Sequence, residues 1–121
     1  MDNQKFNLIL DRLLEKTEGD KLEWEKTANR YTFLVVLEDS SISISLNFDD
    51  AIEFLNPTKF YTFDFRNGNG DIVESVDISK FSGTDKTTKE FEKAEKIFNL
   101  ARSKSLRVDQ TVDRILEQLA A

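Results

Sequence analysis

The chain has 121 residues, a formal net charge of −6 and neither cysteine nor histidine. This length fits one domain, so we expect a single α+β domain over residues 1–121 with one core. Without cysteine there is no disulfide framework or thiolate metal site, and without histidine the chain lacks the commonest proton-transfer side chain near neutral pH. The acidic balance argues against nucleic-acid binding, because such binders neutralise phosphates with surplus lysine and arginine.

The first residues, MDNQKFNLILDRLLEK, contain a short apolar stretch that Asp11 and Arg12 interrupt. This stretch is too polar for the apolar region of a signal peptide and too short to cross a bilayer. We therefore expect a cytoplasmic protein that does not bind membranes.

The N-terminal segment predicts a helix followed by a short strand. Phe6, Ile9, Leu10 and Leu13 recur at three- and four-residue spacing, which predicts a helix over residues 6–19 that ends at Gly19. In KLEWEKT the apolar residues alternate with glutamates, which predicts an extended segment over residues 21–27 with Trp24 turned inward. A core position for Trp24 is favoured over a role as an interface anchor.

Residues 30–48 predict two strands joined by a turn at residues 38–40. In the second strand, apolar side chains at 42, 44, 46 and 48 alternate with serines and an asparagine, as in a sheet that is packed on one face only. The first strand is apolar on both faces, so Leu34 and Val36 lie on the face expected to be open to solvent.

The stretch FYTFDFRNGNGDIVESV predicts a hairpin over residues 60–78, preceded by a connection that Pro57 closes. The Asn-Gly-Asn-Gly run at 67–70 supplies residues that tolerate positive φ, as tight hairpin turns require. A phosphate loop leads from a strand into a helix, and a calcium loop needs oxygen ligands where this run has Phe65 and Gly68. The turn interpretation is therefore preferred.

The C-terminal third predicts helices. Thr87 to Glu90 fits a capping box, and an apolar stripe follows from Phe91 to Ala101. A second helix is predicted from near Asp109, with Val112, Ile115, Leu116 and Leu119 on one face. The pattern leaves open whether residues 103–108 bend or break the helix.

A lysine row at 86, 89, 93 and 96 is interleaved with glutamates and indicates a solvated helix face.

These elements predict an antiparallel meander sheet of four or five strands, with the N-terminal helix and the C-terminal helices packed on one face. The expected core is Leu10, Leu13, Trp24, Phe33, Ile42, Ile44, Leu46, Phe63, Phe65, Ile72, Val76, Phe91, Ile97, Phe98, Ile115 and Leu116.

We expect no catalytic residue, no metal site and no cofactor, and hence no enzyme. Any serine or threonine nucleophile would need a lysine or carboxylate as its base. Asp49 with Asp50, or Asp64 near Asp77, could form a carboxylate pair or a hard-cation site, but their spacing matches no known loop motif.

The leading hypothesis is a non-catalytic protein–protein interaction module that self-associates through the uncovered sheet face or the C-terminal helix. The candidate interface on the sheet joins aliphatic residues to small hydroxyls and charges, a mixture that a second subunit could cover. Its residues are Leu34, Val36, Val73, Thr62, Asp64 and Arg66.

The alternative is an acidic inhibitor of the immunity or anti-defence type, which would bind a cationic site on a nuclease or another effector. Residues 38–77 hold nine carboxylates and two cations, a net charge of −7. The acidic residues expected to contact such a partner are Asp49, Asp50 and Asp64.

Three groups of residues occur in order along the chain: Leu14, Thr17, Gly19, Leu22, Trp24 and Thr27; then Phe65, Asn67, Gly70, Val73, Glu74 and Ser75; then Ala101, Arg102, Val108, Asp109, Ile115 and Leu116. With these residues the chain resembles a group of small bacterial or phage proteins of unassigned function. The resemblance implies a cytoplasmic protein of bacterial or phage origin, and it brings no activity or catalytic residue.

Overall fold

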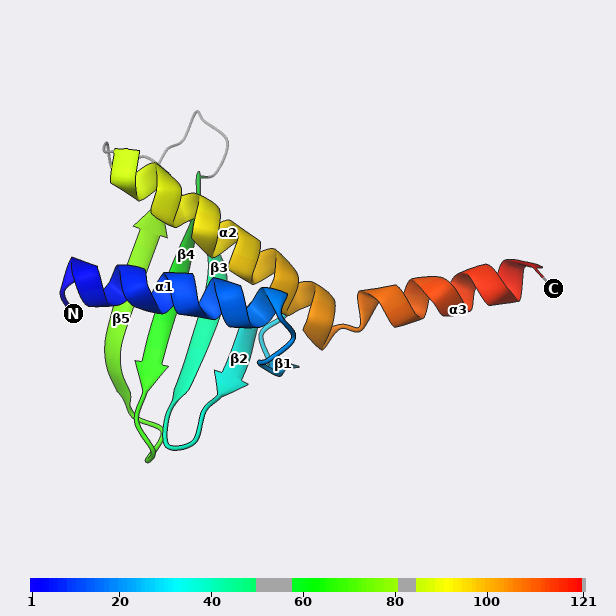
Figure 1. Ribbon diagram of the computed structural model, residues 1–121, viewed down its shortest axis with the longest axis horizontal. Helices are drawn as coiled ribbons and strands as arrows, with labels where there is room; N and C mark the ends of the chain where they lie inside the picture. The colour runs from blue at the N-terminus through cyan, green and yellow to red at the C-terminus, as the bar shows by residue number, and fades with distance from the viewer. Residues whose placement is uncertain (50–57, 81–84, 121) are drawn as a thin grey trace.

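The computed structural model describes residues 1–49, 58–80 and 85–120. The elements in chain order are α1 (Asn3–Glu18), β1 (Trp24–Lys26), β2 (Thr32–Val36), β3 (Ser41–Asp49), β4 (Thr58–Arg66), β5 (Ile72–Ser79), α2 (Asp85–Ser105) and α3 (Val108–Ala120). The strands form one five-stranded antiparallel sheet in the order β1-β2-β3-β4-β5, as the short connections predict. Helices α1 and α2 cross the same face of this sheet (Figure 1). The predicted α+β meander is therefore confirmed.

Strand register places the apolar residues under the helices. Ile42 lies opposite Phe65 and Ile44 opposite Phe63, so their side chains share the covered face, while the intervening Ser43 faces the other way. The predicted alternation of residues 41–48 is thus the alternation that the sheet adopts.

Aromatic side chains from the sheet and both helices form the centre of the core. The ring of Phe6 on α1 packs edge-on against Phe63 and Phe65, with centroid distances of 5.6 and 6.4 Å. Tyr61 lies against Phe91 and Phe98 of α2, at 5.4 Å from each. Such aromatic pairs contribute beyond the area they bury, and here they fix both helices on one face.

Local side-chain bonds define the ends of α1 and the path into β1. Asp2 caps the helix by accepting a hydrogen bond from the backbone N–H of Lys5 at 2.9 Å. Gly19 follows the last residue as predicted, but the positive φ of 56° belongs to Asp20. Trp24 is buried as expected, and its Nε1 donates to Oγ1 of the fully buried Thr17 at 3.0 Å.

One strand position in the predicted core is wrong. The register shifts between Phe65 and Arg66, so Phe65 lies opposite Glu74 whereas Arg66 lies opposite Ile72. From Glu74 to Ile78 the side chains alternate between the two faces of the sheet, and the β-bulge interrupts this alternation before Ile72. Ile72 is therefore exposed instead of buried.

The C-terminal end also departs from the predicted core. Helix α2 begins at Asp85, so Thr87 lies within its first turn and not at the cap that the capping box implies. A true break separates α2 from α3, where Arg107 has a φ of 52°. Among the described elements α3 contacts α2 alone and extends away from the sheet (Figure 1). Ile115 and Leu116 are consequently exposed, and the prediction that they join the core is wrong.

Candidate functional site

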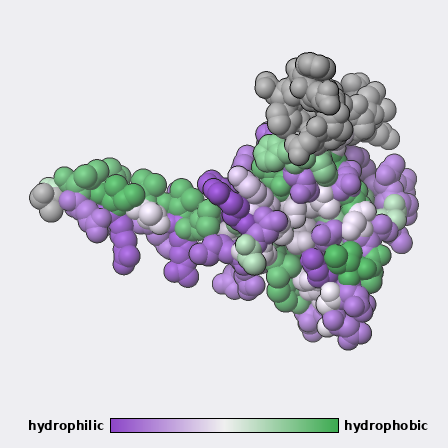
Figure 2. Space-filling model, turned by 180° about the vertical axis from the view of Figure 1, so that it is seen from behind, coloured by the Kyte–Doolittle hydropathy of each residue, from purple (hydrophilic) through white to green (hydrophobic). Residues whose placement is uncertain are grey.

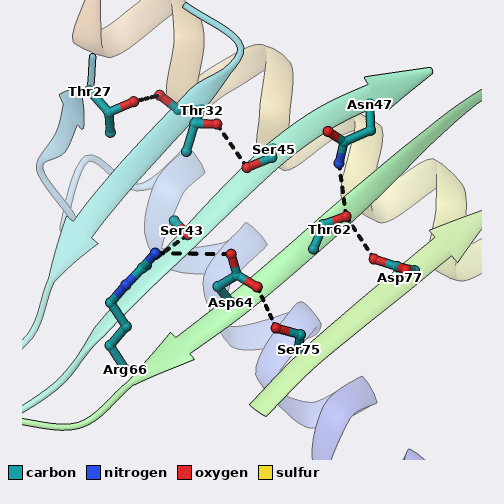
Figure 3. Close-up of polar contacts among 10 residues, drawn as sticks. All are labelled: Thr27, Thr32, Ser43, Ser45, Asn47, Thr62, Asp64, Arg66, Ser75 and Asp77. Atoms are coloured by element: carbon teal, nitrogen blue, oxygen red, sulfur yellow. Dashed lines mark hydrogen bonds and ion pairs between the residues drawn. The ribbon is translucent and has the colours of Figure 1, made fainter. Parts of the chain in front are cut away.

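The uncovered face of the sheet carries a ladder of polar side chains bonded to one another (Figure 3). Thr32 and Ser45 share a hydrogen bond of 2.8 Å between β2 and β3. Across β3, β4 and β5, Asn47 Nδ2 donates a hydrogen bond to Thr62 Oγ1 at 2.9 Å, and Thr62 donates one to Asp77 at 2.7 Å. These cross-strand bonds stabilise the sheet on its solvent side.

A second part of the ladder surrounds Arg66 and Asp64. Arg66 Nη1 donates to Ser43 Oγ at 3.0 Å, and its Nη2 lies 4.0 Å from a carboxylate oxygen of Asp64. The other Asp64 oxygen accepts from Ser75 at 2.5 Å. The polar members of the predicted sheet interface therefore already have partners within the face.

The apolar members of that interface do not form one patch. Leu34 is half-buried, while Val36 and Val73 are exposed on β2 and β5, with β3 and β4 between them. Figure 2 shows this face with its hydrophobic surface broken up by hydrophilic side chains. The structure brings the six predicted residues onto the same side of one sheet, but it separates the aliphatic residues on β2 from the one on β5.

The residues expected to bind a cationic partner are only partly described. Asp50 and the side chain of Asp49 lie outside the described residues. Asp64 is paired with Arg66 and Ser75, which reduces the negative charge that it offers to a partner. The described part of the chain contains no cluster of carboxylates that could hold a metal ion.

One group of titratable residues connects the sheet to α2. Lys59 lies 2.6 Å from Glu95, and the hydroxyl of Tyr61 donates to the same carboxylate at 3.4 Å. Burial, together with the nearby Glu95 charge, raises the pKa of Tyr61 well above its usual value. The hydrogen bond from Lys59 lowers the pKa of Glu95. This group fastens β4 to α2 and needs no ligand to explain it.

Helix α3 carries an apolar face that no other described element buries. None of its residues is buried, and the exposed fractions are 47% for Val112, 47% for Ile115, 60% for Leu116 and 77% for Leu119. Figure 2 shows these side chains as a continuous hydrophobic band along one side of the helix. The sequence pattern found this face. It placed Ile115 and Leu116 in the protein's own core, and it also named the C-terminal helix as one of two possible surfaces for self-association.

An apolar groove runs beside α1, on the flank that faces the β2–β3 turn. It has a volume of about 380 Å³ and is lined by Leu8, Ile9, Arg12, Leu13, Lys16, Leu22, Leu37 and Ile42. Helices α1 and α2 lie on the same face of the sheet, and α2 lies on the side of α1 away from the β2–β3 turn (Figure 1). No described helix therefore covers the part of that face next to the turn. The sequence analysis did not identify the groove. The available signal was Leu8, an apolar residue just outside the predicted helix stripe.

No helix in the described ranges combines the length and the hydrophobicity that a membrane span requires. In comparisons with known proteins, no family model matches the chain, and neither does any curated protein or solved structure.

Proposed function

We propose that this chain is a non-catalytic protein–protein interaction module that self-associates, and that α3 is its binding element. The observation that supports the proposal is the apolar face of α3, which no other described element covers. Burial of this face would provide the driving force for association.

The length of α3 supports the same conclusion. An isolated helix of 13 residues is marginal in water, because nucleation is costly and few hydrogen bonds follow. Helices of this length usually gain their stability from packing an apolar face against another element. A partner that covers Val112, Ile115 and Leu119 would provide that packing, and their spacing of three and four residues suits a helix contact.

The uncovered sheet face is the weaker candidate for the binding surface. Thr62, Asp64 and Arg66 already have hydrogen-bond partners within the face, and Val36 and Val73 lie on strands that do not pair. The acidic-inhibitor alternative stays a prediction, since no contact among the described residues favours it.

Sedimentation velocity of the full chain tests the proposal. We expect the wild type to sediment as an assembly at tens to hundreds of micromolar and the Ile115→Gln variant to sediment as a monomer. Val73→Gln is the matched control, because it removes an aliphatic side chain that is exposed on the sheet face. A wild type that remains monomeric throughout this range would overturn the proposal, and so would loss of the assembly in Val73→Gln alone.

A further inference from the structure

We infer that the occupant of the groove beside α1 is helix α3 of a second copy of this chain, and that the two copies exchange these helices reciprocally. This inference rests on the proposed function and adds the surface that α3 contacts. In a two-fold dimer the same helix-in-groove contact would be made twice.

The groove and the apolar face of α3 agree in length. Along α1 the groove runs from Leu8 to Lys16, which is about 12 Å at the rise of an α-helix. The exposed apolar residues of α3 run from Val112 to Leu119, about 11 Å on the same scale. Two turns of one helix can therefore lie along two turns of the other.

The groove and α3 also have complementary charges. Among the residues that line the groove are two cations, Arg12 and Lys16, and no carboxylate. Next to the apolar face of α3, Asp109, Asp113 and Glu117 follow one another at four-residue spacing. No ion pair within the described ranges involves any of these five residues. Opposite charges at the rim of an apolar contact favour one partner and one orientation.

The direction of α3 favours a second copy over the helix's own groove. The salt bridge between Lys104 and Asp20 holds the end of α2 against the segment after α1, and from there α3 leads outward (Figure 1). Only Leu106 and Arg107 separate α2 from α3, and Arg107 has a positive φ of 52°. Short hinges under strain favour the exchange of an element between copies. A helix that extends away from its own domain is placed to reach another.

The first experiment compares two substitutions with equal exposure. Leu8 in the groove and Ile72 on the opposite face of the sheet are each 53% exposed, so replacement by glutamine should leave the fold intact in both. We expect Leu8→Gln to raise the dimer dissociation constant by about a hundredfold or more and Ile72→Gln to leave it unchanged. The dissociation constant is measured by sedimentation equilibrium, with circular dichroism as the check on folding.

The second experiment mixes Leu8→Gln and Leu116→Gln at a concentration at which each variant alone is expected to be monomeric. A mixed dimer keeps one unaltered contact, between α3 of the groove variant and the groove of the helix variant. We therefore expect native mass spectrometry of the mixture to show heterodimers and few homodimers. As a charge test, Arg12→Glu with Lys16→Glu should weaken the wild-type dimer, and adding Asp109→Lys with Asp113→Lys should restore it.

The possible results separate the two proposals. If Leu116→Gln abolishes the dimer while Leu8→Gln does not, α3 binds elsewhere, and the groove inference falls while the proposed function stands. A different result would be a wild type that is monomeric at every concentration, with Leu8→Gln and Leu116→Gln each less stable than the wild type. In that case α3 folds onto the groove of its own chain. That result overturns both proposals. An absence of heterodimers in the mixture overturns the reciprocal exchange.

Discussion

The double substitution Leu116→Gln/Leu119→Gln distinguishes a helix that packs on its own chain from a helix that packs on a partner. Burying a leucine completely contributes about 1.5–3 kcal/mol. Weighted by the exposed fractions of 60% and 77%, the two residues would contribute about 2–4 kcal/mol per helix when covered. A dimer contains two such helices, so the loss is at least ~4 kcal/mol, or about a thousandfold in the dissociation constant.

The same substitution should leave the monomer almost unchanged. Leucine and glutamine have similar helix propensities, and among the described elements α3 contacts only α2. We expect the free energy of unfolding at dilute, monomeric concentration to change by no more than about 0.5 kcal/mol. Urea unfolding monitored by circular dichroism measures this value, and sedimentation equilibrium measures the association. A loss of about 2 kcal/mol in the monomer with unchanged association would refute the reasoning.

Three further predictions concern the fold. Trp24→Phe should destabilise the protein by about 1–3 kcal/mol in urea unfolding, because the buried Thr17 hydroxyl loses its donor. The double variant Trp24→Phe/Thr17→Val should lose less stability than the two single variants together. Strictly additive losses would contradict an energetic coupling between the two side chains. Gly70→Ala should cost about 1 kcal/mol in the same assay, since φ is 85° and no atom lies near the added Cβ; an unchanged midpoint would contradict this cause. The raised pKa of Tyr61 means that the folded state favours the neutral phenol, so its contribution is complete below pH 10 and is lost as the pH rises toward the folded pKa. Tyr61→Phe should therefore flatten the decline of stability above pH 10 in urea unfolding, and an equal slope in both proteins would contradict the assignment.

Most of the fold could be predicted because its signals are local. Period-two alternation in residues 41–48 fixed both the strand and the face that it buries, and the turn residues at 67–70 fixed the hairpin. The error at Ile72 arose because a β-bulge shifts the side-chain phase by one residue and leaves no mark in an apolar run.

The candidate site was harder to predict because it depends on what each apolar face contacts. Helical periodicity shows that Ile115 and Leu116 lie on one face, but it does not show whether that face meets its own sheet or another molecule. The groove was missed for a related reason, since Leu8 and Leu37 become neighbours only when α1 crosses the sheet. The complementary charges of α3 and the groove could not be recognised from the sequence, because they can be compared only after both surfaces are located in the fold.

Hydrogen exchange of the α3 backbone amides, followed by mass spectrometry over a range of protein concentrations, tests the central claim most directly. Coverage of α3 by a second copy predicts slow exchange in residues 108–120 at high concentration and rapid exchange on dilution, with the core strands unchanged. Exchange in α3 that is equally rapid at every concentration would show that nothing covers the helix and would contradict the account.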